Sequence, residues 1–524
     1  MHRTTLNHCA IAFAFVLLVA VAAPNGTSQT KGNPQNPAAL TERIHRIEDG
    51  AVLVPLGAGE APLQFDLPTL MRQMHMPGLS IAVIDDFKIA WAKGYGVTEV
   101  GGSVPVSPET LFQTGSISKP VAAMGTMQLV EQGKLSLDED VNKKLVSWKV
   151  PENQFTQEQK VTLRRIMSHS AGTTVHGFPG YSVDGPMPTL VQVLNGESPA
   201  NTRSIVVDIL PGTQWRYSGG GVTIEQQLVL DVTGKPFPQF MRETVLDKIG
   251  MDHSTYEQPL PAAKAVMAAS GTRQNGTMTP GKWHVYPEMA AAGLWTTPTD
   301  LAKCAIEMAL SMRGQANHVL SEKTTREMLS PQIDHMALGW FLDEKNPDQF
   351  GHTGDNDGFE AALVMLSDSG QGVAIMANSQ NLYHIEDYII ESVAREYKWK
   401  YIPPQHSAGD ALMLVEKAKG PEQALQWYQN LQKEKPSGYS FSENDLNTLG
   451  YDLLNSDKVD QALEVFKFNV EAYPKSWNVY DSLGEAYAKA GKKDLAIRNY
   501  EKSVELNPKN VDGAAILKKL KEQN

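Results

Sequence analysis

Hydrophobic residues fall into alternating strand-like and helix-like stretches over the first three quarters of the chain. Residues 80–84 and 88–91 are apolar and rich in β-branched side chains, and Asp85 and Asp86 separate them, a pattern typical of a β-hairpin. Residues 121–130 are apolar at helical spacing. They stop just before Gly133, and glycine commonly follows the last turn of a helix.

The same patterns recur farther along and predict a fold class. Strand-like stretches cover 338–342, 361–366 and 372–377, with an Asp-Ser-Gly turn between the last two, and a helical pattern covers 384–397. Strands at both ends with helices between them favour one antiparallel sheet that carries a helical insertion and is flanked by helices. We therefore expect an α+β domain over residues 40–402.

The chain changes character after Pro403 and Pro404, where it begins to repeat itself. The matched pairs, each 34 residues apart, are Leu449-Gly450 with Leu483-Gly484, Ala462 with Ala496, Phe466 with Tyr500, and Pro474 with Pro508. This offset is the tetratricopeptide period. Ala424, Tyr428 and Pro436 keep the same internal spacing, which indicates a third, degenerate copy.

We expect residues 410–524 to form an all-α tetratricopeptide array in which 511–523 is the capping helix. A generic pair of helical hairpins is the alternative. Arrays of this kind present concave surfaces to other proteins, so the prediction includes a protein partner on the concave face.

The N-terminus resembles a secretory signal. His2 and Arg3 precede an uncharged apolar run over 10–23, which ends in small residues and is too short to span a bilayer comfortably. We interpret residues 1–23 as a cleaved signal peptide and the polar residues 24–39 as a flexible leader. The mature protein would then be periplasmic or secreted, with no stable membrane span. An uncleaved anchor is the alternative.

The composition of the chain excludes several classes of function and of binding site. There are 47 Lys and Arg residues against 59 Asp and Glu residues, and the resulting net charge of −12 argues against a nucleic-acid surface. The two cysteines, Cys9 and Cys304, are too few for a disulfide scaffold or a cysteine zinc site. The sequence contains no phosphate-loop, dinucleotide or H-E-x-x-H motif. We therefore expect neither a cofactor nor a metal.

Ser116 and Lys119 open the helix predicted over 121–130 and would lie on one of its faces. A partly desolvated ammonium loses its proton more easily and can then help to remove the hydroxyl proton of a serine. The motif is weak in isolation, since Ser28 and Lys31 match it too, in the polar leader with no apolar helix after them. A serine that caps a helix is the structural alternative for Ser116.

Two later motifs strengthen the catalytic interpretation. Tyr217 and Ser218 precede three glycines, and His352, Thr353 and Gly354 follow the strand expected around Trp340 and precede another. The order Ser-x-x-Lys, Tyr-Ser, basic-Thr-Gly resembles the serine hydrolases that include class C β-lactamases and penicillin-binding carboxypeptidases. Residues 163–172 and 292–301 also resemble segments of that family, and the resemblance covers about residues 40–400.

The resemblance implies roles for seven residues. Ser116 would be the nucleophile that forms an acyl-enzyme, Lys119 would assist its deprotonation, and Tyr217 would act as general base and then as general acid, as a phenolate beside an ammonium. The remaining residues would bind the substrate: Thr353 and Gly354 would shape the strand along which it lies, Asp355 would share the oxyanion hole with Ser116 through backbone N–H groups, and His352 would contact a substrate carboxylate or tune Tyr217.

The sequence departs from the lactamase pattern at two positions. Gly219 stands where the family's Tyr-x-Asn motif has an asparagine, and His352 stands where a lysine is common. Both changes weaken recognition of a negatively charged lactam or peptide C-terminus, and neither removes the acylation machinery. We therefore expect a broad serine hydrolase of small-molecule or peptide substrates, with esters, D-amino-acid peptides and β-lactams all open.

A scaffold protein is the alternative from another class. Its hydrolase fold would be catalytically weak or inactive, and the tetratricopeptide repeats would do the main work. Retention of Ser116, Lys119 and Tyr217 together argues against it. Outside these motifs, His169 is expected to be a structural residue at a helix end, and Cys304 a buried, inert thiol in an apolar helix over 300–312.

Overall fold

The computed structural model describes residues 37–57 and 59–522. The predicted signal peptide, residues 1–23, lies outside the described residues, and so do residues 24–36 of the predicted leader. Helix α1 spans Pro37–Asp49, so residues 37–39, which we expected in the leader, are helical. Within the described ranges, no helix is both long enough and apolar enough to cross a membrane.

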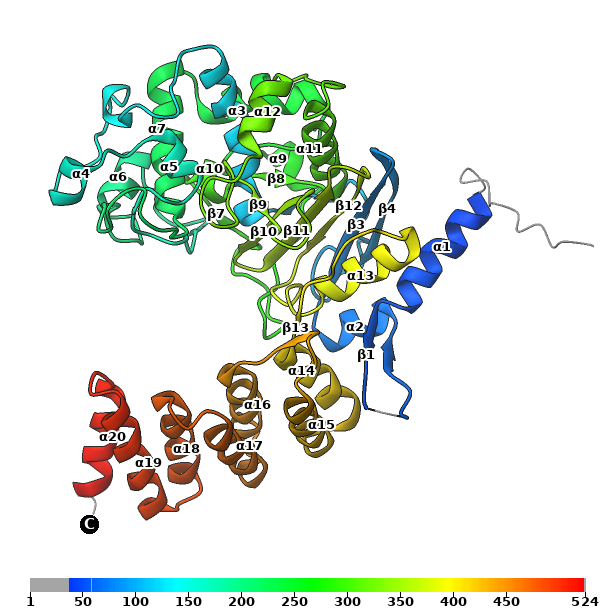
Figure 1. Cartoon of the computed structure of the whole chain (residues 1–524), viewed down its shortest axis with the longest axis vertical. Coiled ribbons are helices and arrows are strands. Elements are labelled where there is room, and N and C mark those ends of the chain that lie inside the picture. The colour runs from blue at the N-terminus through cyan, green and yellow to red at the C-terminus, as the bar shows by residue number, and fades with distance from the viewer. Residues whose placement is uncertain (1–36, 58, 523–524) are drawn as a thin grey trace, which may run out of the picture. The chain divides into compact units, whose positions relative to one another are not determined.

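A six-stranded antiparallel sheet forms the centre of the α+β region (Figure 1). Its strands occur in the order β4-β3-β12-β11-β10-β9, so that the first hairpin of the chain pairs with the last strand of the domain. The strands are β3 (Gly78–Asp85), β4 (Lys88–Gly96), β9 (Phe341–Leu342), β10 (Gln349–Asn356), β11 (Phe359–Leu366) and β12 (Gln371–Ala377). The expected α+β fold with one antiparallel sheet is confirmed.

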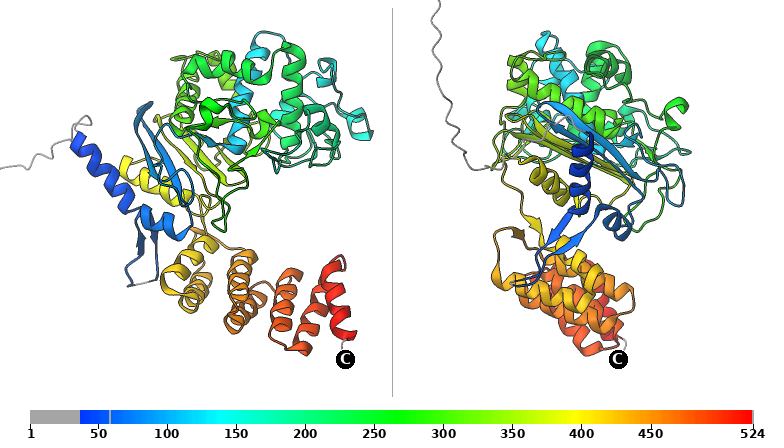
Figure 2. Two further views of the ribbon diagram at one scale, coloured as in Figure 1. Left: turned by 180° about the vertical axis from the view of Figure 1, so that it is seen from behind. Right: turned by 90° about the vertical axis from the view of Figure 1, so that its right-hand side faces the viewer.

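The first hairpin shows why this sheet is stable. Asp86 and Phe87 both have positive φ, 51° and 59°, as a two-residue turn that matches the strand twist requires. Residues 78–84 of β3 are all buried, because helices cover both faces. Helix α11 (Pro298–Ser311) packs on β3, β11 and β12, while α13 (Glu386–Tyr397) packs on β12 from the other face (Figures 1 and 2).

Two strand predictions near residue 350 need correction. The stretch 338–342 is a strand only at Phe341 and Leu342, because Gly339 turns the chain with a φ of +84°. The backbone N–H of Leu338 bonds to Met328 and that of Gly339 to Met167, so neither is available to a strand neighbour. The motif at His352 precedes β11, as we expected, but it also lies inside a strand, β10, that the sequence pattern did not predict.

Helices and short strand pairs fill the chain between β4 and β9. The helices are α3 (Ser118–Glu131), α4 (Gln154–Glu158), α5 (Leu163–Met167), α6 (Leu190–Asn195), α7 (Gly219–Thr233), α8 (Phe237–Met241), α9 (Ala262–Ala265), α10 (Met289–Ala292), α11 and α12 (Glu322–Met328), with short turns η1 (Gly115–Ile117), η2 (Val141–Lys143), η3 (Arg242–Leu246) and η4 (Asp247–Ile249). The short pairs are β5 (Phe112–Gln113) with β8 (Trp295–Thr296), and β6 (Tyr181–Ser182) with β7 (His284–Val285). This helical insertion supplies the segments that face β10.

Elements outside the sheet and the insertion come before β3 and after α13. Before β3 lie β1 (Val52–Val54), β2 (Leu63–Phe65) and α2 (Leu67–Gln73). After α13 come β13 (His406–Ser407) and β14 (Tyr439–Ser440), with the helices α14 (Ala408–Lys419), α15 (Pro421–Glu434), α16 (Glu443–Asn455), α17 (Val459–Ala472), α18 (Trp477–Lys489), α19 (Lys493–Leu506) and α20 (Val511–Glu522).

The helices α14 to α20 form the expected array of antiparallel helix pairs (Figure 2). Its repeated residues explain the period. A Cβ atom added at Gly450 would lie 2.5 Å from the ring of Phe466, and one added at Gly484 would lie 3.1 Å from the ring of Tyr500. The glycine of the first helix therefore admits the aromatic ring of the second, and this close packing recurs in both repeats.

Candidate active site

Ser116 lies where a tight turn becomes a helix. It is the middle residue of η1, directly before α3, and its side chain is partly exposed. The turn touches β10: Gly115 has a φ of +52°, and a Cβ atom there would be 2.5 Å from the backbone nitrogen of Asp355. Glycine is thus required at this position both by its conformation and by the close approach of the strand.

Lys119 is buried beside Ser116. Its Nζ lies 2.8 Å from Ser116 Oγ and 2.8 Å from the carbonyl oxygen of Ala291, which belongs to α10. Both partners are uncharged, and the side chain is 4% exposed. Burial without a carboxylate to offset it lowers the pKa of Lys119 to about 7, so a large fraction of the side chain is a neutral amine near neutral pH.

Tyr217 reaches the same pair from the loop before α7. Lys119 Nζ lies 5.0 Å from the centre of its ring, and the Ser116 side chain is near enough to act on the pKa of its hydroxyl. Ser218 begins α7 as its N-cap by accepting a hydrogen bond from the N–H of Gly221. Withdrawal from solvent raises the pKa of Tyr217 well above its usual value, which favours a phenol and not the phenolate expected from the sequence.

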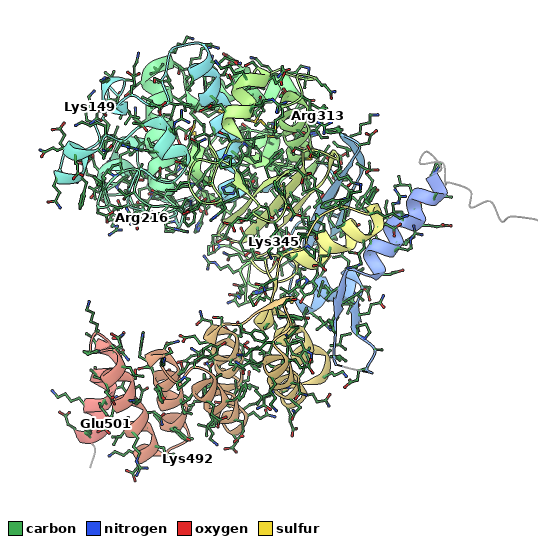
Figure 3. The ribbon with its side chains drawn as sticks, in the orientation of Figure 1. Lys149, Arg216, Arg313, Lys345, Lys492 and Glu501 are labelled. Carbon is green, nitrogen blue, oxygen red and sulfur yellow. The ribbon has the colours of Figure 1, made fainter. Side chains whose placement is uncertain are left out.

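The loop that carries Tyr217 is fixed by its neighbour Arg216, which is labelled in Figure 3. The Arg216 guanidinium donates a hydrogen bond to the carbonyl oxygen of Gly172 at 2.8 Å and forms an ion pair with Asp208. The backbone N–H of Arg216 donates to the carbonyl oxygen of His169. These contacts hold the Tyr217 loop against the segment that follows α5.

Strand β10 supplies the fourth side of the site. Its register with β9 includes only Phe350 and Gly351, so from His352 onward no described strand pairs with its outer edge. A Cβ atom at Gly354 would lie 1.9 Å from the carbonyl oxygen of Thr114 and 2.8 Å from the nitrogen of Ser116. The side chains of Thr353 and Asp355 are exposed, on the face of β10 opposite to that of His352 and Gly354.

The ring of His352 lies 6.3 Å from that of Tyr217, and the side chain is electrically neutral. It is 4% exposed, and burial together with the nearby Lys119 lowers its pKa to about 3. Its Nδ1 donates a hydrogen bond to the carbonyl oxygen of Thr353. Nε2 is therefore the acceptor nitrogen, and it is buried with no hydrogen-bond partner among the described residues. His352 offers no positive charge to a substrate carboxylate at neutral pH.

The glycine that replaces the family's asparagine has a structural reason. Gly219 is the first residue of α7, and its N–H donates to the carbonyl oxygen of His176 at 2.9 Å. A Cβ atom at Gly219 would lie 3.0 Å from that oxygen and 3.0 Å from the ring of Phe178. The loop over 176–178 thus lies where the start of an asparagine side chain would be.

Two histidines to which we assigned no catalytic role from the sequence also lie beside the reacting groups. His169, expected to be structural, accepts a hydrogen bond from the N–H of Ser218, and its ring lies 4.3 Å from that of Tyr217. The exposed ring of His176 lies 4.9 Å from Tyr217 on another side. Nothing in the sequence distinguishes His176, since its proximity depends on how the loop after α5 folds back over α7.

Cys304 is not a second nucleophile. Cys304 is buried in α11, and burial raises its pKa to about 12, so it remains a thiol. Within 37–57 and 59–522, no group of three or more His, Cys, Asp or Glu side chains is arranged to hold a metal ion.

Two family models and several known proteins match parts of the chain. A family model described as Beta-lactamase matches residues 66–395, and a tetratricopeptide repeat model matches residues 477–510. The chain is 24% identical over 328 residues to Protein flp of Staphylococcus aureus strain N315, and 27% identical over 347 residues to the unguisins hydrolase ungD' of Aspergillus campestris. These alignments cover 60% and 61% of this chain, and the chain spans only 62% of the length of each relative.

Among solved structures, an octameric penicillin-binding protein homologue from Pyrococcus abyssi has a similar fold. Its TM-score is 0.50 at 22% identity, and the match covers 62% of this chain and 74% of that one. Likeness at this level of identity concerns the fold alone.

Proposed function

Because the chain belongs to the beta-lactamase family, we propose that it is a serine hydrolase that cleaves ester or amide bonds through an acyl-enzyme on Ser116. The observation that carries this proposal is the pairing of Ser116 Oγ with a buried, uncompensated amine, Lys119 Nζ, at 2.8 Å. The name of the Aspergillus campestris relative states that it hydrolyses unguisins, which supports hydrolysis in this family.

Acylation begins with proton transfer from Ser116 to Lys119. The amine is neutral in a large fraction of molecules near pH 7, because its pKa is lowered to about 7, and it lies within hydrogen-bond distance of the hydroxyl. The serine oxygen then attacks the substrate carbonyl carbon. The start of α3 adds partial positive charge beside the developing alkoxide.

Tyr217 then acts as the acid for the leaving group. Its raised pKa keeps it protonated, and its hydroxyl lies near the Ser116 side chain, so its proton is available close to where the bond to the leaving group breaks. Lys119, protonated in the first step, lies 5.0 Å from the Tyr217 ring and can return a proton to the phenolate. Deacylation by water uses the same groups in reverse order.

The backbone N–H groups of Ser116 and Asp355 would stabilise the oxyanion. The required approach of the two segments is present, because Gly115 and Gly354 leave no room for a side chain between η1 and β10. Donors fixed in a folded backbone need little reorganisation when negative charge develops on the carbonyl oxygen. Thr353 and Gly354 would border the substrate along the free edge of β10.

The preferred substrates are neutral near the scissile bond. His352 is uncharged at neutral pH, and no asparagine side chain is present at residue 219 to bind an acyl amide. A carboxylate-bearing lactam or a peptide C-terminus would therefore lack two polar contacts. We place esters and amides ahead of β-lactams, with D-amino-acid peptides between them.

Covalent labelling tests the nucleophile directly. The full chain should react with a fluorescent penicillin or fluorophosphonate, and the Ser116→Ala variant should not. A panel of short-chain esters, D-amino-acid amides and lactams, run with both proteins, then ranks the substrates. Labelling that survives the substitution would remove Ser116 from its proposed role.

A scaffold role for the tetratricopeptide array is the second candidate. The family model for the repeat supports an interaction with another protein, on the concave face of the array. Turnover by residues 38–402 alone would show that the repeats are an accessory to the enzyme. If the protein shows no turnover, and wild type and Ser116→Ala are labelled equally, the scaffold role is favoured. We expect turnover, since all proposed catalytic positions precede residue 356.

We also propose that the protein acts outside the cytosol, in the periplasm or after secretion. The basic and apolar pattern of residues 1–23 supports this location. N-terminal sequencing of the protein recovered from cell fractions tests it: the mature chain should begin near residue 24.

A further inference from the structure

A chain of ring contacts extends from Tyr217 through Phe341 and His335 to Trp215. The ring of Phe341 is nearly parallel to that of Tyr217, with 9° between the planes and 6.3 Å between the centres. His335 stacks on Phe341 at 5.5 Å, and Trp215 lies 5.2 Å from His335. Trp215, His335 and Phe341 are called the aromatic patch below.

The edge of the sheet determines where this patch lies. Phe341 pairs with Gly351 in the short ladder between β9 and β10, which brings its ring within 4.7 Å of the His352 ring. One residue farther along β10, at His352, the ladder has ended and the outer edge is free. The patch is therefore next to the start of the edge along which the substrate would lie, on the same side as Tyr217.

The patch can receive a ligand. The side chains of Trp215, His335 and Phe341 are all partly exposed, so none of them is sealed inside the core. The His352 ring lies 4.7 Å from the Phe341 ring, and its Nε2 is a buried acceptor without a partner among the described residues. An alcohol or amine carries the O–H or N–H donor that such an acceptor lacks.

We propose that the aromatic patch binds the leaving group of the substrate, and that the preferred substrates release an aromatic alcohol or amine. This inference rests on the proposed function, because there Tyr217 gives its proton to the leaving group. The departing group must then lie against the Tyr217 hydroxyl, with Phe341 and His335 on the adjoining side. Offset and edge contacts between rings favour an aromatic group over an alkyl group of the same reactivity.

Two acetate esters test the proposal on the full chain. Benzyl acetate and ethyl acetate release alcohols of similar acidity. The ratio of kcat/KM for the two esters therefore reports how well the enzyme binds the leaving group. We expect Phe341→Ala to lower kcat/KM for benzyl acetate about tenfold and for ethyl acetate less than about twofold. Phe341→Leu should fall between the two proteins for the benzyl ester, since it keeps apolar volume without a ring.

The control is Trp477→Ala, which removes an exposed aromatic side chain (36% exposed) from α18 in the repeats. This variant should leave the ratio of kcat/KM for benzyl acetate to kcat/KM for ethyl acetate unchanged. Equal losses on both esters in Phe341→Ala would overturn the proposal.

Direct binding separates this inference from the proposed function. Saturation-transfer NMR with benzyl alcohol requires no turnover, and the signal should weaken in Phe341→Ala but not in Trp477→Ala. If the wild type hydrolysed neither ester yet bound benzyl alcohol through Phe341, the hydrolase proposal would fail and the patch would stand. If benzyl alcohol does not bind, or binds equally well to wild type and Phe341→Ala, the proposed role of the aromatic patch is refuted.

Discussion

The buried side-chain amide of Asn356 donates hydrogen bonds to Gln113 Oε1 and to the carbonyl oxygen of Ala292, both at 3.0 Å. Gln113 lies in β5, three residues before Ser116, and Ala292 follows the residue that accepts from Lys119. Asn356 itself follows Asp355. One amide thus joins the segment before Ser116, the segment whose Ala291 carbonyl accepts from Lys119, and the strand that carries Asp355.

Removal of this amide should impair the reaction more than substrate binding. We expect Asn356→Ala to lower kcat about tenfold with little change in KM, because the reacting groups lose their mutual alignment while the free edge of β10 remains. Unfolding free energy should also fall by about 1–3 kcal/mol, since two buried acceptors lose their donor. The matched control is Asn378→Ala, which removes a buried amide that bonds to three carbonyls elsewhere in the domain. That variant should lose stability but keep kcat per folded molecule.

The pH dependence of acylation should follow Lys119. Its pKa is lowered to about 7, and the reaction needs the neutral amine, so kcat/KM for an uncharged ester should rise about tenfold per pH unit below pH 7 and level off above it. Stopped-flow or steady-state rates from pH 5 to pH 9 measure the profile. A rate that is flat across pH 7 would contradict the role of Lys119 as the base.

The buried Lys119 side chain should also destabilise the folded protein. Its pKa is lower in the folded chain than in the unfolded chain, so over the pH range between the two values only the unfolded state holds the proton, and stability rises with pH there. Lys119→Met should therefore raise Tm at pH 6 while abolishing turnover, and the gain should shrink between pH 7 and about pH 10. Calorimetry of both proteins at several pH values measures this. A variant less stable than the wild type at pH 6 would be inconsistent with an uncompensated buried amine.

The contact between β10 and η1 should not tolerate a methyl group. In Gly354→Ala, the new Cβ would start 1.9 Å from the carbonyl oxygen of Thr114, so the strand must move away from Ser116. We expect a loss of kcat of about a hundredfold or more, as for loss of an oxyanion donor. Gly438→Ala, where the added Cβ would meet nothing within 4 Å, should retain full activity. Full turnover by a folded Gly354→Ala protein would show that the oxyanion hole lies elsewhere.

Restoration of the family's asparagine should not restore lactam turnover. Gly219→Asn places a Cβ 3.0 Å from both the His176 carbonyl oxygen and the Phe178 ring, so the loop over 176–178 must shift. We expect a Tm several degrees lower and no gain in hydrolysis of a chromogenic cephalosporin. Gly177→Asn, at an open position in the same loop, should leave Tm nearly unchanged. Efficient cephalosporin turnover by Gly219→Asn would mean that the missing side chain alone sets the substrate preference.

Local pattern was sufficient for most of the fold. The apolar runs that became β3, β11 and β12 are recognisable because they are buried continuously, and the 34-residue repeat is recognisable because Gly450 and Gly484 must each admit a ring. Strand β10 was not recognised, because glycines and polar residues interrupt it. Its burial alternates, and its strand form depends on pairing with β11 and not on its own propensity.

The amino-acid sequence by itself determined which chemical groups are available and in what order: Ser116, Lys119, Tyr217 and the motif at His352. Side-chain chemistry and short-range spacing are properties of the chain alone. The tertiary structure decided their state. It buried Lys119 without a counter-ion, left His352 neutral, kept Tyr217 protonated and placed Phe341 beside it. Desolvation and ring contacts depend on segments more than a hundred residues apart, which no local pattern specifies.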